Sequence, residues 1–221
     1  MCFSATASFA TASVTAAIGA VAFASVREKR DFPLVVVPLG FAAQQAVEGT
    51  LWLLLDRGIA DGPAVAGLSL AFLLFAEVFW PAFIPLAVLL DEPDPRRRPA
   101  LRVLAACGAA LALYLLAALV QTTPGVEVYA GNLRYDFTGG GAPWIYLPYV
   151  VVTCGPLLLS SHRIVRWAGG VTLAAFALAF YAHYQALVSV WCFFAAVNST
   201  LIYVHIRYRA AAGGTQAARA G

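Results

Sequence analysis

The sequence predicts an all-α fold, a bundle of seven transmembrane helices with a short β-hairpin-like loop at its outer end. Of its 221 residues, 62% are hydrophobic and 11% are charged, whereas soluble domains have roughly 25% charged residues. Apolar runs of about 20 residues, the length of a membrane-spanning helix, recur along the chain. We therefore expect lipid to surround most of the surface and the chain to be a multi-pass protein of the cell membrane.

Turn-forming or charged segments separate the apolar runs. The predicted spans are 5–26, 33–55, 64–90, 100–120, 143–160, 164–182 and 184–206. No soluble domain fits between them. Residues 1–209 are therefore expected to form a single transmembrane domain, and residues 210–221 a flexible cytoplasmic tail.

Lysine and arginine predict the orientation, because cytoplasmic loops carry an excess of both. With the N-terminus outside and the C-terminus in the cytoplasm, only Arg57 and Arg134 lie outside. The net charge of +3 then reflects topology and does not indicate a nucleic-acid partner. The alternative for the first span is a signal peptide, since Ala22-Phe-Ala24 resembles a cleavage site, although no basic residue precedes the run.

The one long external loop, residues 121–142, shows a strand-like pattern. Residues 126–130 and 133–137 alternate in character around Gly131-Asn132, as two short strands joined by a tight turn do. This pattern predicts a hairpin that caps the outer end of the bundle. The alternative is an irregular loop in which Gly139-Gly-Gly141 provides conformational freedom.

Two carboxylates, Glu48 and Glu77, fall inside predicted spans, and neither has a lysine or arginine deep enough to pair with it. An ionisable group in the bilayer costs several kcal/mol and marks a candidate functional site. Gln44, Gln45 and Trp52 share the Glu48 face of the second span, at i−4, i−3 and i+4. These residues form either a ligand or metal site or an interhelical hydrogen-bonded contact, typically worth about 0.6–2 kcal/mol.

Glu77 lies four residues before Pro81, which has no amide hydrogen for the Glu77 carbonyl. One turn later, Pro85 likewise has no amide hydrogen for the Pro81 carbonyl. The third span should therefore kink near Glu77 and expose backbone oxygen beside a carboxylate, which suits a cation or a proton path. The alternative is a protonated glutamic acid hydrogen-bonded to a neighbouring helix.

Polar residues also recur along the last span. Gln185, Ser189, Cys192 and Ser199 fall on one helical face. His183 is the only histidine near the outer leaflet, so it joins Gln185 and Ser189 as a candidate ligand-binding residue.

Cys2 is the unusual residue of the N-terminus. Removal of Met1 would leave an α-amine and a thiol on adjacent carbons, able to chelate a soft metal or to act as a nucleophile with the amine as base. With Glu48 and Cys192, Cys2 forms a predicted metal site, and Cys2 and Glu48 are the candidate catalytic residues. The alternative is an inert buried thiol.

Several seven-span classes do not fit these residues. A retinal protein needs a lysine in the last span, whereas Lys29 is the only lysine of the chain, so retinal is excluded. Seven-span zinc hydrolases need several histidines reachable from one face. His162 and His205 fall at the cytoplasmic ends of spans, and we interpret both as interfacial.

Three segments carry a resemblance to a known family. They are Met1-Cys-Phe-Ser-Ala5, Gln44-Gln-Ala-Val-Glu48 with Trp52, and Ser189-Val-Trp-Cys-Phe193. Together they resemble an uncharacterised family of multi-spanning membrane proteins along the whole chain. The resemblance implies a site at Cys2, Gln44, Glu48, Trp52, Trp191 and Cys192 and does not imply an activity.

Three functions remain open. The first is a polar pocket in the outer half of the bundle that binds a small ligand or a soft transition metal, with the hairpin as a partial lid. The second is a membrane-embedded thiol- or metal-dependent enzyme acting on a lipid-soluble substrate. The third is a proton- or cation-coupled carrier that uses Glu48 and Glu77. Substrate and oligomeric state do not follow from these residues.

Overall fold

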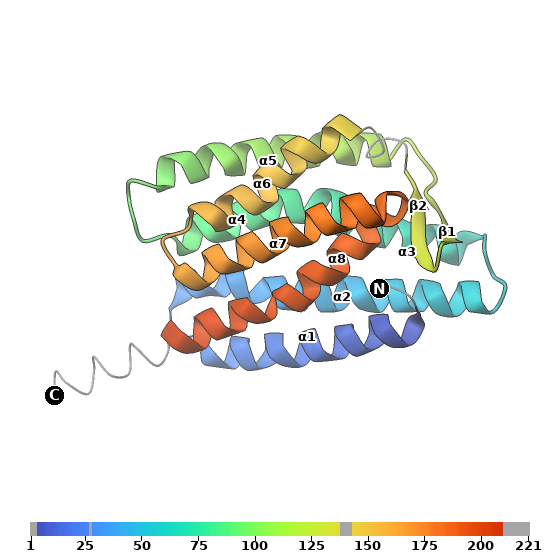
Figure 1. Cartoon of the computed structure of the whole chain (residues 1–221), viewed down its shortest axis with the longest axis horizontal. Helices are drawn as coiled ribbons and strands as arrows, with labels where there is room; N and C mark the ends of the chain where they lie inside the picture. Colours follow the sequence, from blue (N-terminus) through green and yellow to red (C-terminus); the bar gives the residue numbers. More distant parts are fainter. Residues whose placement is uncertain (1–3, 27, 138–142, 210–221) are drawn as a thin grey trace.

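The structure is a computed structural model that describes residues 4–26, 28–137 and 143–209 as a bundle of long helices (Figure 1). The helices are α1 (Ala5–Ser25), α2 (Phe32–Asp56), α3 (Pro63–Leu73), α4 (Trp80–Asp91), α5 (Arg98–Leu119), α6 (Tyr146–Leu159), α7 (Arg163–Ala182) and α8 (Leu187–Asn198). A π-helical segment, η2 (Leu74–Phe79), joins α3 to α4, and after Asn198 the last helix continues to residue 209. Counting α3, η2 and α4 as one, the described residues contain the seven predicted helices.

Six helices of the described chain are long and apolar enough to cross a membrane. They cover Ala5–Ser25, Lys29–Asp56, Pro63–Asp91, Arg98–Leu119, Arg163–Ala182 and Tyr184–Arg209. The remaining helix, α6, is apolar but has only 14 residues, and a short 3₁₀ turn, η3 (Pro143–Ile145), precedes it. Length and composition therefore support a multi-pass membrane protein.

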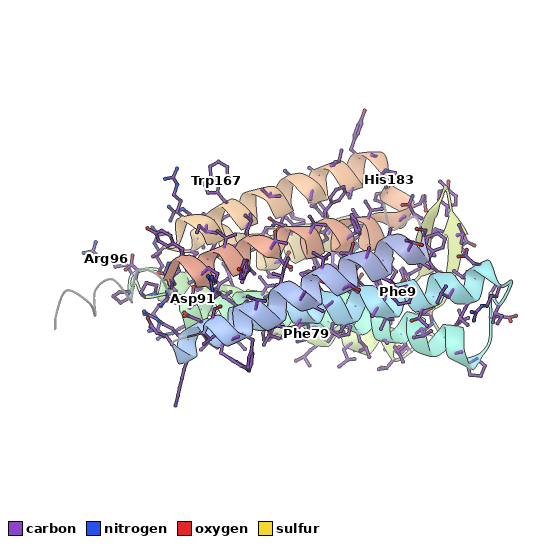
Figure 2. The ribbon with its side chains drawn as sticks, turned by 90° about the horizontal axis from the view of Figure 1, so that it is seen from below. Phe9, Phe79, Asp91, Arg96, Trp167 and His183 are labelled. Atoms are coloured by element: carbon purple, nitrogen blue, oxygen red, sulfur yellow. The ribbon has the colours of Figure 1, made fainter. Side chains whose placement is uncertain are left out.

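Large apolar side chains cover the outside of the bundle. Exposed examples on α5, α6 and α7 include Leu113, Leu147 and Leu178, and Figure 2 shows Trp167 pointing away from the helices. A soluble monomer rarely exposes so extended an apolar surface. Lipid contact explains it, because acyl chains solvate apolar side chains well.

The chain folds back and forth between two ends (Figure 1). At the end we call the basic end, α1, α4 and α6 finish and α2, α5 and α7 begin. α1 packs along α2, α4 against α5 and α6, and α7 against α6 and α8. The last helix, α8, also contacts α1 and α2, so residues from both termini of the chain share one core.

At the opposite end, the hairpin end, β1 (Gly125–Tyr129) pairs antiparallel with β2 (Asn132–Asp136). This confirms the predicted hairpin, with the strands one residue earlier than expected. The two turn residues are Ala130 and Gly131, both with positive φ, as a tight hairpin turn requires. Asn132 is therefore not a turn residue, and its side-chain amide donates a hydrogen bond to the Ala130 carbonyl.

Candidate functional site

The polar stripe of α2 is completely buried inside the bundle. Gln44, Gln45 and Glu48 have no exposed surface, because this face of α2 meets α4 and α8. Ser189 Oγ donates to Glu48 Oε1 over 2.6 Å, and Gln45 Nε2 donates to Glu48 Oε2 over 3.1 Å. Both carboxylate oxygens therefore accept hydrogen bonds, and one bond joins α2 to α8.

Gln44 connects the same face of α2 to two other helices. Trp80 Nε1 on α4 donates to Gln44 Oε1 over 2.6 Å, and the Trp80 ring stacks on Phe41 at 4.0 Å between centroids. The buried thiol of Cys192 on α8 lies near the Gln44 side chain, whose Nε2 has no hydrogen-bond partner among the described residues. We call Gln44, Gln45, Glu48, Trp80, Ser189 and Cys192 the Glu48 cluster.

Several buried polar atoms near this stripe lack a hydrogen-bond partner among the described residues. They are Gln44 Nε2, Gln45 Oε1 and Trp52 Nε1 on α2, Ser8 Oγ on α1 and Ser69 Oγ on α3. A buried polar atom without a partner costs about 1–3 kcal/mol. The predicted ligand-binding face of α2 thus retains unused hydrogen-bonding capacity around Glu48.

Glu77 lies in the π-helical segment η2, where the Trp80 amide bonds to the carbonyl of Phe75. In this spacing the Ala76 carbonyl would need an amide hydrogen from residue 81, which is proline and has none. The Tyr149 hydroxyl on α6 donates to the Ala76 carbonyl instead. The helix thus widens before Pro81, and Ala76 is a further residue whose carbonyl Pro81 leaves without an amide donor. The freed carbonyl at Glu77 itself stays a prediction.

The hairpin end contains an open pocket of about 710 Å³, which we call the hairpin pocket. Its lining includes Glu77, Gln185 and Ser189 from the helical side. The hairpin contributes Arg134 and Asp136, among others. Ser189 belongs to both the pocket lining and the Glu48 cluster, so the pocket adjoins Glu48 through one side chain.

The charges of the hairpin pocket are mostly negative. Among the described lining residues, Glu77, Glu127 and Asp136 are acidic and Arg134 is the single cation. Arg134 is already paired with Glu127 at 2.5 Å and lies 5.0 Å from the Tyr129 ring centroid. None of the described residues forms a hydrogen bond or ion pair with the Glu77 carboxyl, and Glu77 as a whole is only 5% exposed.

The other predicted site residues lie in three different places. His183 caps the C-terminal end of α7, with Nδ1 3.5 Å from Asn132 Nδ2 of the hairpin. Gln185 belongs to the 3₁₀ turn η4 (Tyr184–Ala186), outside α8. Trp52 packs in a buried cluster with hairpin residues such as Leu133. Cys2 lies outside the described residues, so its part in a metal or catalytic site stays a prediction.

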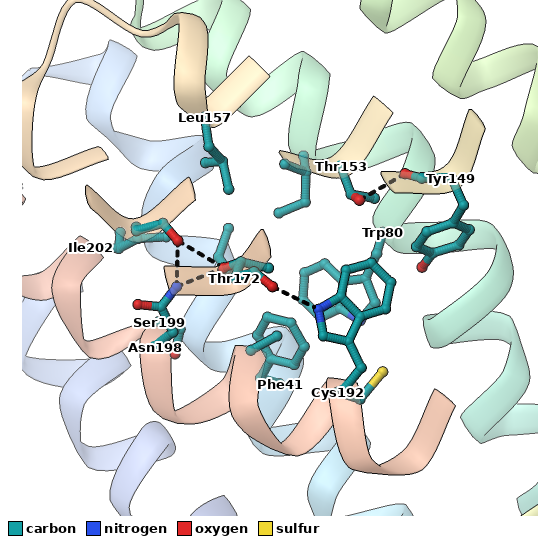
Figure 3. A pocket seen from close by; sticks show the side chains of 15 residues that line it. Phe41, Trp80, Tyr149, Thr153, Leu157, Thr172, Cys192, Asn198, Ser199 and Ile202 are labelled. Carbon is teal, nitrogen blue, oxygen red and sulfur yellow. Dashed lines mark hydrogen bonds between the residues drawn. The ribbon is translucent and has the colours of Figure 1, made fainter. Parts of the chain in front are cut away.

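Trp191 lines a different space from the hairpin pocket. Its indole donates to the Thr172 carbonyl over 3.2 Å and borders an internal cavity of about 60 Å³ (Figure 3). Cys192, Tyr149 and Asn198 border the same cavity. The resemblance-based site is thus divided: Gln44, Glu48 and Cys192 meet in the Glu48 cluster, whereas Trp191 belongs to the cavity beside it.

Two residues that complete this region, Trp80 and Tyr149, were not predicted from the sequence. Each contributes a hydrogen-bond donor to α2 or η2 from another helix. The available signal was chemical: an indole N–H or phenol O–H inside a membrane span needs an acceptor from the protein. Local spacing does not indicate which helix supplies that acceptor.

Comparison with known proteins supports the family resemblance. No curated protein and no solved structure matches the chain. The model of one family, described as "Family of unknown function (DUF6629)", matches residues 1–218. Because the match spans almost the entire chain, this protein belongs to the DUF6629 family of unknown function.

Proposed function

We propose that this multi-pass membrane protein binds a small organic cation, of the class of amines and ammonium compounds, in the hairpin pocket. The observation that carries the proposal is the Glu77 carboxyl, which lines the pocket without a hydrogen bond to any described residue. A buried carboxylate without a partner is costly, and a ligand cation beside it would offset much of that cost.

The rest of the lining suits the same ligand class. With Arg134 bound to Glu127, the remaining charges, those of Glu77 and Asp136, are both negative. Tyr146 and Tyr184 also line the pocket, with ring centroids 6.2 Å apart. Aromatic faces attract ammonium groups through their quadrupoles, and a volume of about 710 Å³ is typical of a small-molecule site.

The Glu48 cluster supports the wall of this pocket. Ser189 lines the pocket, and its hydroxyl donates a hydrogen bond to the Glu48 carboxylate. Glu48 and Cys192 also remain candidate ligands for a soft metal together with Cys2, and Cys2 and Glu48 remain the candidate catalytic residues of a thiol- or metal-dependent enzyme. Both of these alternatives depend on Cys2, whereas the amine site depends only on described residues.

The test measures amine binding to purified protein in detergent by calorimetry. The probes are a panel of small ammonium compounds, including choline, each compared with an uncharged carbon isostere. We expect wild type to prefer the cations. Glu77→Gln should weaken their binding about 10–100-fold, because a hydrogen bond to a charged group contributes about 1.5–3 kcal/mol.

The matched control is Asp61→Asn, which removes one negative charge from the loop between α2 and α3 at the same end. This variant should bind the cations like wild type. Equal binding of cations and isosteres by wild type, or equal loss in both variants, would contradict the proposal.

A second candidate function, a cation-coupled carrier, is favoured by the path along α8. Ser189 borders the hairpin pocket, while Cys192 and Ser199 border the internal cavity deeper in the bundle. The π-helical segment beside this path is a structure often found at functional sites. Uptake of a bound amine into proteoliposomes, lost in Glu77→Gln, would establish transport; binding without uptake would rule it out.

A further inference from the structure

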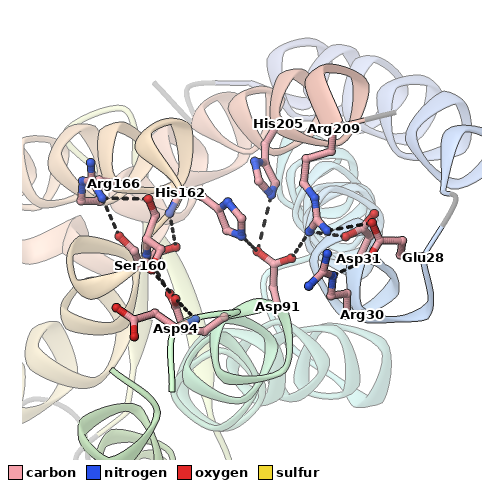
Figure 4. A network of polar contacts seen from close by, with 12 residues as sticks. Glu28, Arg30, Asp31, Asp91, Asp94, Ser160, His162, Arg166, His205 and Arg209 are labelled. Atoms are coloured by element: carbon pink, nitrogen blue, oxygen red, sulfur yellow. Dashed lines mark hydrogen bonds and ion pairs between the residues drawn. The ribbon is translucent and has the colours of Figure 1, made fainter. Parts of the chain in front are cut away.

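Three side chains that can ligate a metal, those of Asp91, His162 and His205, meet at the basic end of the bundle (Figure 4). Asp91 is the last residue of α4, His162 is the N-cap of α7, and His205 lies in the last turns of the final helix. Nε2 of His162 lies 3.3 Å from Asp91 Oδ2, and Nε2 of His205 lies 3.5 Å from the same oxygen.

These contacts are close without being hydrogen bonds. Neither histidine Nε2 has a hydrogen-bond partner among the described residues, although both atoms are buried. The three candidate ligand atoms lie within 4.8 Å of one another. In a tetrahedral zinc site with bonds of about 2.0–2.2 Å, two ligand atoms lie about 3.3–3.6 Å apart, which agrees with both nitrogen to oxygen distances.

The other carboxylate oxygen of Asp91, Oδ1, accepts a hydrogen bond from Arg209. Arg209 Nη1 donates to Asp91 Oδ1 over 2.7 Å and also contacts Asp31 Oδ1 at 2.5 Å. Such an outer contact orients a metal-binding carboxylate and leaves one oxygen for the metal. Asp91 and His205 are almost completely buried, and the His162 side chain is 21% exposed, so an ion could enter beside His162.

The surrounding charges favour a cation. Glu28 is paired with Arg30 and Arg209, and the hydrogen bond from Arg30 holds the pKa of Glu28 below its ordinary value. Glu28, Asp31 and Asp91 thus face two arginines, Arg30 and Arg209. The group carries one net negative charge before any metal binds.

We propose that Asp91, His162 and His205 form a binding site for a divalent transition metal of the zinc class, which ties together the end of α4, the start of α7 and the helical segment that follows α8. Two histidines and one carboxylate are a ligand set that zinc accepts, and three protein ligands leave a fourth position for water or an exogenous group. The sequence offers no spacing motif for this site, because its ligands come from three distant segments.

The test titrates metal-depleted protein in detergent with Zn²⁺ by calorimetry, and with Co²⁺ by visible spectroscopy. We expect one equivalent of Zn²⁺ and the visible bands of tetrahedral Co²⁺. His162→Ala and His205→Ala should each weaken Zn²⁺ binding at least about 100-fold, since losing even an outer-shell partner costs 10–100-fold. The matched control is His183→Ala, because His183 is the chain's remaining histidine and lies at the hairpin end (Figure 2).

Three results would overturn the site: no Zn²⁺ binding by wild type, undiminished binding by the His162 and His205 variants, or equal loss in His183→Ala. If an alanine variant does not fold, His205→Gln keeps the volume, and its Co²⁺ spectrum still reports loss of a nitrogen ligand. Amine binding at the hairpin pocket is a separate measurement, so either proposal can fail without the other.

Discussion

Single buried side chains in this bundle act as acceptors and donors between helices. Glu48 accepts from Ser189 of α8, and Gln44 accepts from Trp80 of α4. Inside a membrane no water competes for these bonds, and an unsatisfied polar group is costly. At this scale, the hydrogen-bonding capacity of a residue and its charge can be separated by substitution.

Glu48→Gln should distinguish the hydrogen-bonding role of the Glu48 side chain from the role of its negative charge. Glutamine keeps an acceptor oxygen, and its amide can donate to the Ser189 hydroxyl, so we expect unfolding in detergent to change by less than about 1 kcal/mol. Ligand binding at the hairpin pocket should decrease, since Ser189 lines that pocket. Glu48→Ala should instead destabilise the fold by about 1–3 kcal/mol. Unchanged ligand binding in Glu48→Gln would leave Glu48 with only an interhelical structural role.

Tyr149→Phe removes the hydroxyl that donates to the Ala76 carbonyl. The carbonyl then stays buried without a partner, which should cost about 1–3 kcal/mol in unfolding free energy. Tyr114→Phe is the control, because Tyr114 is exposed and should tolerate the change. Equal stability of the two variants would show that the η2 backbone does not depend on Tyr149.

At the scale of elements, the prolines of the third span determine how α4 meets its neighbours. Pro81 has no amide hydrogen, and η2 widens the helix in front of it. Pro85 likewise cannot bond to the Pro81 carbonyl, and Gly108 of α5 packs directly against that oxygen. A glycine is needed there because a Cβ atom would lie only 2.1 Å from the oxygen.

Gly108→Ala should therefore push α5 away from α4. We expect a loss of about 1–3 kcal/mol in stability, the usual cost of overpacking a well-packed contact. Gly170→Ala on α7 is the control, since a Cβ atom there meets nothing within 4 Å and alanine favours a helix. Thermal unfolding in detergent compares the two, and a Gly108 variant as stable as the control would refute the close approach.

At the scale of the whole molecule, charge is divided between the two ends of the bundle. The hairpin end holds Arg57 and Arg134, while the loops at the basic end hold clusters such as Arg96-Arg-Arg98. From the positive-inside rule we expect the basic end in the cytoplasm and the hairpin pocket outside. The membrane orientation of both proposed sites depends on this division.

Reporter fusions test the orientation directly. A reporter fused after Arg98 or Arg209 should give a cytoplasmic signal, and one inserted near Asn132 should report outside. The physical reason is the cost of moving arginine clusters across the bilayer. A cytoplasmic signal at Asn132 would reverse the orientation and place the hairpin pocket inside the cell.

The helices, the hairpin and the polar stripe around Glu48 could all be predicted from the amino-acid sequence. These features depend on local properties: a run of apolar residues, a turn next to Gly131, and residues one helical turn apart on α2. The bond from Gln45 to Glu48 could be anticipated for this reason, because three residues separate them along one helix.

Which helices contact one another, in contrast, follows from the packing of the complete bundle. Trp80 reaches Gln44 across 36 residues and Ser189 reaches Glu48 across 141, and apolar spans carry no local signal for such pairings. His162 and His205 look interfacial in the sequence, yet the bundle brings both to Asp91. The physical reason is that helix packing depends on the fit of whole surfaces, so residues distant in sequence become neighbours only when the complete bundle forms.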